Sequence, residues 1–233
     1  MNYRIFMLPI KLVRVILGIN TQEHTGEFQM IEYLAKHYDD LIRATLEHLQ
    51  LVLLALAISL VAAGLFTILC SYSKRASGII LGLLSMVYSI PSLAMFAMMI
   101  PLTGLGQATA VIVLVIYNQY LLLRNFLAGL EGVDRGIVEA AVGIGMTPMQ
   151  VLVKIKLPLA KGAFLAGIRI AMVATVSIAT IAASINAGGL GIILFDGLRT
   201  MNYAKILWGS ILSALLAIFI DRLLGFFEKS FRK

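Results

Sequence analysis

The chain has 233 residues, of which 60% are hydrophobic and 13% are charged, and its formal net charge is +7. Soluble domains contain about 45–50% apolar and about 25% charged residues, so this composition excludes an ordinary soluble domain and indicates a membrane protein. Basic residues in such a chain usually set the topology and contact anionic lipid, and we therefore expect a lipid bilayer around the chain and no nucleic acid as a partner.

Residues 1–44 are predicted to form an amphipathic and polar N-terminal segment. Arg4, Lys11 and Arg14 fall on one face of a helix through residues 3–19, opposite aliphatic side chains. This pattern is typical of a helix that lies on the membrane surface, and a sixth membrane span is the alternative. The cations also interrupt the apolar run that a cleavable signal peptide requires. Residues 20–48 are expected to be a polar lead-in that becomes helical before the first span.

Long runs with few charges predict five membrane-spanning helices, because about 20 apolar residues cross the hydrocarbon core. We place these helices near residues 49–71, 79–100, 107–127, 161–185 and 204–224. Pro101 and two glycines supply a turn between the second and the third. The expected fold is therefore an all-α, polytopic membrane protein with five transmembrane helices.

Lysine and arginine gather in three connecting segments: 71–78, 128–160 and the tail after residue 221. The positive-inside rule places these three segments in the cytoplasm. The N-terminal tail then lies outside although it also carries cations, and a sixth span through residues 3–19 would bring it inside.

The single cysteine and the three histidines carry no sign of chemistry. Cys70 lies inside an apolar run and is expected to be a packed, unreactive thiol. His24, His37 and His48 are not spaced three or four residues apart, so we expect surface or interfacial histidines and no metal site.

The sequence Ile90-Pro91-Ser92 is predicted to break the second span near its middle. Proline frees a backbone carbonyl there, which Ser92 or a neighbouring helix could satisfy. The break is either a functional bend or a purely structural kink.

Residues 134–158 are too interrupted to span a bilayer and too apolar for a solvated loop. Asp134 is a suitable N-cap for a short helix through Ile144, and Gly145 suits the left-handed position after it. Thr147 then restarts a helix, with proline and a capping-box glutamine following it. So much exposed apolar surface indicates a protein partner, and an amphipathic loop lying on the membrane is the alternative.

Arg169 is the only charge well inside the fourth apolar run, and such a residue is a functional candidate by default. The alternative is a position near the cytoplasmic interface, paired with an acid such as Glu131 or Asp134. The glycine-rich turn Asn186–Gly191 at the outer end of this span either receives a docking partner or is a simple turn.

The segment 134–158 also carries a motif that resembles that of a known family. Its residues match E-A-A-x3-G-x9-I-x-L-P, the EAA motif of the membrane subunits of bacterial ATP-binding-cassette (ABC) importers: Glu139, Ala140, Ala141, Gly145, Ile155, Leu157 and Pro158. The chain is similar to the five-span permeases of the methionine-importer-like fold. Further stretches resemble the osmoprotectant permeases: TLEHLQLVLLALAIS (45–59), YSIPSLAMFAMMIPLTGLG (88–106), LRNFLAGLEGVD (123–134), AGIRIA (166–171) and INAGGLG (185–191).

This resemblance implies a permease domain over residues 45–228, with a coupling segment at 134–158. Residues Glu139 to Gly145 would contact a separate ABC ATPase subunit, and the motif residues Ile155 to Pro158 would fix the segment to the fourth span. The chain has no phosphate-binding G-x4-G-K-[ST] loop, so it is expected to be no enzyme and to hold no cofactor. ATP and magnesium would bind the partner ATPase. An extracytoplasmic substrate-binding protein and a second permease, identical or a sister chain, complete the expected assembly.

The resemblance also implies a translocation path for glycine betaine, carnitine or choline. A quaternary ammonium needs no counter-charge where aromatic rings attract it by about 0.5–2 kcal/mol each, although most aromatic residues in spans only pack. The candidates are Tyr88, Pro91, Ser92, Phe96, Tyr117 and Tyr120, with Trp208 as a further ring.

Two other functions are weighed against this one. Methionine or another small solute is the alternative cargo within the family. An ion-coupled secondary transporter is the alternative from another class, but it usually carries acidic residues inside its spans, and no Asp or Glu lies between Leu49 and Leu130.

Overall fold

The computed structural model describes residues 21–71 and 73–231, and the predicted surface helix at residues 3–19 lies outside this range. The elements, in chain order, are helices α2 (Thr21–Ser71), α3 (Lys74–Tyr88), α4 (Ser92–Thr103), α5 (Gln107–Glu131), α6 (Arg135–Gly143) and α7 (Pro148–Val151), the π-helix η1 (Leu152–Lys156), α8 (Leu157–Leu159), α9 (Lys161–Ala182), the 3₁₀-helix η2 (Ala183–Ile185), α10 (Leu190–Arg199) and α11 (Tyr203–Phe231). No strand occurs in these residues, which confirms the all-helical prediction.

Among the described residues, four helical stretches are long and apolar enough to cross a membrane: Met30–Ser71, Gln107–Glu131, Lys161–Ile185 and Tyr203–Lys229. The predicted second span is not one helix. It consists of α3 and α4, which meet at an angle of 95°, so the number of candidate spans is four, or five if the bent pair counts as one. Helix α2 covers 51 residues with a kink at His37, where φ is −126° and ψ is 21°, and it extends well beyond the predicted span 49–71.

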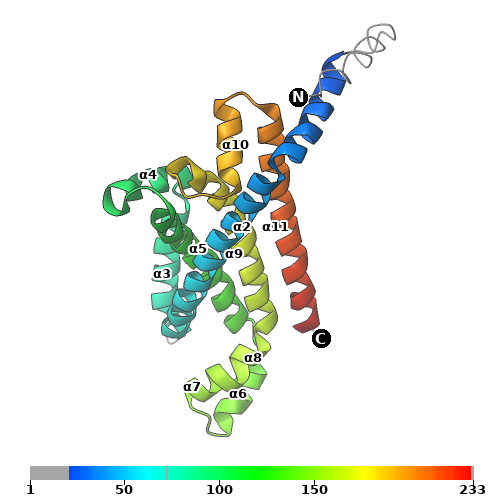
Figure 1. The fold of residues 1–233 in the computed structure, drawn as a ribbon. Coiled ribbons are helices and arrows are strands. Elements are labelled where there is room, and N and C mark those ends of the chain that lie inside the picture. The colour runs from blue at the N-terminus through cyan, green and yellow to red at the C-terminus, as the bar shows by residue number, and fades with distance from the viewer. Residues whose placement is uncertain (1–20, 72, 232–233) are drawn as a thin grey trace.

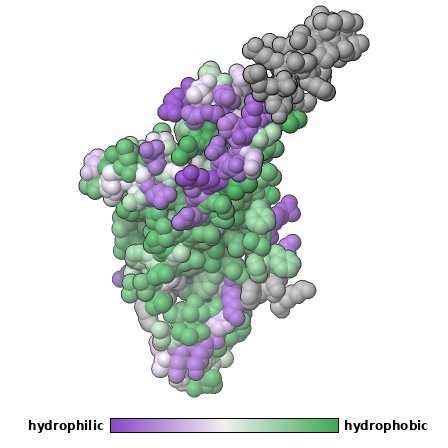
Figure 2. All heavy atoms as spheres, viewed as in Figure 1, coloured by the Kyte–Doolittle hydropathy of each residue, from purple (hydrophilic) through white to green (hydrophobic). Residues whose placement is uncertain are grey.

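The helices form an elongated bundle, with α6, α7 and α8 hanging below one end and α10 at the other end (Figure 1). Helices α2, α5 and α9 supply most of the buried core, which includes Val52, Val113 and Val176. Helix α11 lies at the periphery, and only 6% of its apolar window is buried. Figure 2 shows hydrophobic residues over the middle of the bundle and hydrophilic residues at both ends, as a membrane-spanning body requires.

Polar side chains also join the three central helices. Asn118 Nδ2 on α5 donates a hydrogen bond to Ser59 Oγ on α2 over 3.2 Å, and Thr175 Oγ1 on α9 donates to Asn118 Oδ1 over 2.9 Å. All three residues are buried. Because each polar group finds a partner in a neighbouring helix, this network fixes how α2, α5 and α9 face one another.

The end of the bundle opposite α6 to α8 is closed by the turn between η2 and α10. Asn186, Gly188 and Gly189 all have positive φ, and His48 of α2 packs directly against Gly189. His48 is fully buried and its Nε2 lies 3.1 Å from the carbonyl oxygen of Val176. The prediction of a surface or interfacial histidine is therefore wrong for His48, because the side-chain-free glycine leaves a space that the imidazole fills.

Candidate functional site

The first half of the candidate coupling segment is helix α6. The Asp134 carboxylate caps its N-terminus by accepting hydrogen bonds from the backbone N–H groups of Gly136 (2.7 Å) and Ile137 (3.3 Å). Its C-terminus is closed at Gly145, where φ is +86°. Gly145 N donates to the Val142 carbonyl and the next residue donates to the Ala141 carbonyl, which together make a Schellman motif.

The second half begins at Thr147, one residue after this turn. Thr147 Oγ1 accepts from Gln150 N over 3.3 Å, and Gln150 Oε1 accepts from Thr147 N over 2.9 Å, so the capping box is complete. Pro148 occupies the first helical position, where no backbone N–H is needed. The helix then widens into the π-helix η1 and returns to α-geometry in α8. Ala160 separates α8 from α9, which begins at the next residue. The π-helix was not predicted from the sequence.

The motif residues divide between the surface of this segment and its interior. Glu139, Ala140 and Gly145 are exposed, and Ile144 beside the turn is 81% exposed. Ala141 is buried. In the second half, Ile155 and Leu157 are half-buried and Pro158 is exposed.

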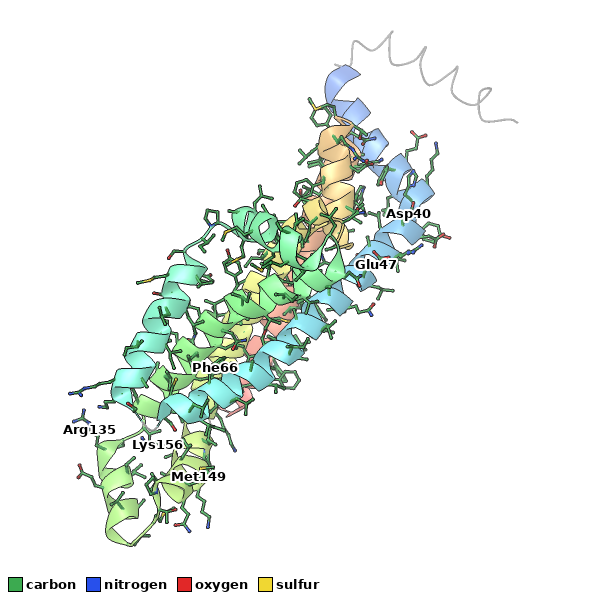
Figure 3. All side chains as sticks on the ribbon, turned by 90° about the vertical axis from the view of Figure 1, so that its left-hand side faces the viewer. Asp40, Glu47, Phe66, Arg135, Met149 and Lys156 are labelled. Carbon is green, nitrogen blue, oxygen red and sulfur yellow. The ribbon has the colours of Figure 1, made fainter. Side chains whose placement is uncertain are left out.

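Two hollows flank the segment. An apolar cavity of about 270 Å³ lies between its two halves, lined by Val138, Val142, Val151 and Leu152 among others. A second hollow of about 330 Å³ places Glu139 on a wall with three cations, Lys74, Arg135 and Lys156. Figure 3 shows Arg135, Met149 and Lys156 gathered at this end of the molecule, far from Asp40 and Glu47. The segment thus presents an apolar tip beside a charged wall.

The break between α3 and α4 brings three of the predicted path residues together. The Tyr117 hydroxyl on α5 donates a hydrogen bond to the Ile90 carbonyl at the break. The Tyr88 ring lies 5.6 Å from the Tyr117 ring and 5.0 Å from the Tyr120 ring, centroid to centroid. Arg124 lies 5.9 Å from the centre of the Tyr120 ring and donates to its hydroxyl over 3.2 Å.

The other predicted path residues do not join this tyrosine cluster in the same way. Pro91 is exposed and Ser92 is half-buried at the start of α4. Phe96 is fully buried in the hydrophobic core, so its ring packs between helices of this chain. The Trp208 indole N–H donates to the Met30 carbonyl over 3.0 Å and thereby joins α11 to α2.

Arg169 has other partners than the two that the sequence suggested. It forms ion pairs with Asp221 and Glu228 on α11. Asp134 instead caps α6, so the expected pairing with Glu131 or Asp134 is wrong. The sequence does hold a signal for the true partners, because residues seven apart on a helix share a face.

At the opposite end, Asp196 on α10 accepts hydrogen bonds from Lys205 on α11 and from Arg199. These hydrogen bonds, chiefly the one from Lys205, lower the pKa of the Asp196 carboxyl below its ordinary value. The ion pair with Lys205 therefore fastens α10 to the start of α11.

Comparison with known proteins supplies a family. The family model for the binding-protein-dependent transport system inner membrane component matches residues 55–233. The chain is 33% identical over 200 residues to the choline transport system permease protein OpuBB of Bacillus subtilis (strain 168), covering 86% of this chain and 92% of that protein. It is 33% identical over 201 residues to the glycine betaine/carnitine/choline transport system permease protein OpuCB of the same organism, covering 86% and 93%. The inward-facing MetNI methionine ABC transporter contains a chain with the same fold, at a TM-score of 0.75 and 21% identity, covering 82% of this chain and 95% of that one.

Proposed function

Since the chain belongs to the family of binding-protein-dependent transport system inner membrane components, we propose that it is the permease subunit of an ABC importer for osmoprotectants such as glycine betaine, carnitine or choline. The cargo class rests on the names of relatives that are 33% identical over 86% of this chain. The methionine transporter shares only the fold, at 21% identity, and therefore adds nothing on cargo.

The observation that carries the proposal is the shape of the segment 134–158. Its two short helices meet at Gly145 and expose Glu139 and Ile144, outside the membrane-spanning bundle. An apolar tip of this kind suits a cleft in an ATPase subunit, with the Glu139 carboxylate as the polar contact. Ile155, Leu157 and Pro158 join this tip to α9, so a displacement of the tip moves α9.

ATP hydrolysis belongs to the partner in this proposal, because the chain has no phosphate-binding loop. Closure of two ATPase subunits around ATP and magnesium would bring two coupling segments together. A permease dimer, of two copies or with a sister chain, would then change from inward-facing to outward-facing. A separate extracytoplasmic binding protein would deliver the cargo.

The proposed topology counts α3 and α4 together as the second of five spans. The coupling segment then lies in the cytoplasm, in agreement with the lysines and arginines of its surroundings. The turn at Asn186–Gly191 lies at the outer end, on the side where the binding protein would dock.

The proposed cargo path runs past the break between α3 and α4, over Tyr88 and Tyr120, with the buried Tyr117 packed against Tyr88. The half-buried rings of Tyr88 and Tyr120 lie in contact and offer a surface for a quaternary ammonium by cation–π attraction. Pro91 and Ser92 shape the break itself. Phe96 is not part of this surface, because it is buried within the chain.

Charge reversal at Glu139 tests the proposal. We expect Glu139→Lys to insert normally, to lower the affinity for the ATPase by about thirtyfold, or about 2 kcal/mol, and to lose uptake of labelled betaine, carnitine and choline. The measurement uses proteoliposomes that contain the permease and the ATPase, with the binding protein added. Asp39→Lys is the control, because it reverses an exposed carboxylate on α2, far from the coupling segment. Full uptake by Glu139→Lys would refute the docking role.

A further inference from the structure

The ion cluster between α9 and α11 has a geometry built for one arginine. Arg169 Nε donates to Asp221 Oδ1 over 2.6 Å and Nη2 donates to Asp221 Oδ2 over 2.8 Å, while Nη1 reaches Glu228 Oε2 at 3.2 Å. The first two bonds form a fork that matches both carboxylate oxygens, which only a planar guanidinium can do. The cluster therefore fixes the orientation of the two helices as well as their distance.

Gly225 of α11 lies between the two carboxylates and completes the cluster. A Cβ atom on this residue would lie 3.3 Å from the guanidinium carbon of Arg169. Any side chain at this position would thus press on the guanidinium. This face of α11 consists of two acids and a space without a side chain, and it fits Arg169 of α9.

Stability alone is a poor explanation for this cluster. Arg169 and Asp221 are 35% and 33% exposed and Glu228 is 16% exposed, so all three charges have lost part of their hydration. Apolar side chains of similar volume would hold two helices together at a lower desolvation cost. What an ion cluster adds is a single register between the helices.

The position of the cluster along α9 connects it with the coupling segment. Arg169 lies about 12 Å along the helix from Lys161, at which α9 begins directly after α8 and Ala160. At its other end, α11 is held by α10, because Gly197 and Gly209 let the two backbones approach closely and Asp196 pairs with Lys205. The described residues show no other ion pair between α9 and α11.

We propose that Arg169 is a positioning residue that makes α9 and α11 move as one body when the coupling segment is displaced. This inference rests on the proposed function of the chain as an ATP-driven permease. Without the cluster, only non-directional apolar packing, such as that of Ile220 in the main core, joins α11 to α9, so α11 and the attached α10 follow the displacement of α9 incompletely. The ATPase then still cycles, but fewer cycles deliver cargo.

The test measures ATP hydrolysis and betaine uptake side by side in proteoliposomes that hold the complete transporter. For Arg169→Gln we expect about tenfold more ATP hydrolysed per molecule imported, since couplings between sites commonly span 5- to 150-fold. The charge-exchanged double variant, Arg169→Asp with Asp221→Arg, is expected to return the ratio toward the wild-type value. Arg222→Gln, which removes an exposed charge next to Asp221, is the matched control and leaves the ratio unchanged.

The outcomes separate the two proposals. If the wild-type complex imports no betaine, the proposed function fails and the ratio has no meaning. If the wild type imports betaine and Arg169→Gln keeps its ratio, or loses uptake and hydrolysis in equal proportion, Arg169 is only structural and the inference is overturned. If Arg169→Gln does not assemble with the ATPase, the charge-exchanged variant takes its place in the test. The inference is then overturned if the assembled charge-exchanged variant hydrolyses as much ATP per molecule imported as Asp221→Asn, which lacks the ion pair.

Discussion

Individual small residues decide how closely α5 and α9 approach. A Cβ atom on Gly167 would lie 2.7 Å from Cβ of Asn125, and one on Gly129 would lie 2.6 Å from Cβ of Ala163. Neither approach is possible for real side chains without moving a backbone. In a bilayer, where lipid tails are as apolar as leucine, such close contacts provide much of the attraction between helices.

Alanine at Gly167 is therefore expected to overpack this crossing and to destabilise the fold by about 1–3 kcal/mol. Gly64→Ala is the matched control, because nothing lies within 4 Å of a Cβ atom there. This control is expected to raise stability by up to about 1 kcal/mol, since alanine favours a helix over glycine. Thermal unfolding of both variants in detergent measures the difference, and equal midpoints would contradict the close approach.

Asp196 gives the molecule a pH-dependent contact. Its pKa is lower in the folded chain than its ordinary value of 3.8, so its contribution to stability is complete above that value and disappears as the pH falls through the lower, folded pKa. Asp196→Asn removes the contribution at every pH. We expect the thermal midpoints of wild type and variant to differ at neutral pH and to converge as the pH falls from about 4 through the lower, folded pKa of Asp196.

At the scale of elements, local signals predicted the ends of α6 and α7 well. Asp134, Gly145 and Thr147 act through hydrogen bonds to backbone groups two to five residues away, so a short window of sequence contains the whole interaction. The bend at Pro91 was predictable for the same reason.

Distant partners were harder to predict, because the information lies in the packing. The full burial of His48 depends on Gly189, and that of Phe96 depends on the surrounding core. Arg169 had several acids within reach in the sequence, and only the packing of α9 against α11 selects Asp221. Residues 20–48 were expected to become helical before the first span, but neither the point at which this helix begins nor the kink at His37 was predicted.

Loss of the capping box provides a test at this scale. Thr147→Ala leaves the Gln150 N–H without its side-chain acceptor and is expected to cost about 1 kcal/mol, so that α7 opens more often. Thr147→Ser keeps the hydroxyl and is expected to behave as wild type. Hydrogen exchange of the amides of residues 149–151 measures the opening, and equal protection in Thr147→Ala would contradict the cap.

At the scale of the whole molecule, the membrane acts as the missing outer layer. Large apolar side chains stay exposed along α11, including Leu215 at 54% and Phe219 at 65%. Helix α11 packs against α2, α9 and α10, yet only 6% of its apolar window is buried, so we expect lipid to cover much of the remaining surface. The ion cluster with Arg169 and the pair between Asp196 and Lys205 hold it at two separate places.

A cation in the middle of this lipid-facing surface should prevent insertion. We expect Leu215→Arg to cost about 3 kcal/mol, because a charged side chain is unfavourable in the middle of a membrane-spanning helix. The fraction of chains that reach the membrane should fall accordingly. Leu215→Ala removes the same apolar contacts without adding a charge and serves as the control. Fractionation of membranes from expressing cells measures both, and equal insertion would show that protein, not lipid, covers this face.

The π-helix at Leu152–Lys156 sets the direction in which the proposed coupling segment points. A π-helical turn contains one residue more than the α-helical turn it replaces, and each residue rotates the chain by about 100°. Deleting a single residue here would restore regular geometry and keep every cap, yet it would swing Glu139 and Ile144 by roughly a quarter of a revolution about the helix axis. Two permeases with the same residues in the coupling segment would therefore bind different ATPase subunits if only one of them contained this extra residue.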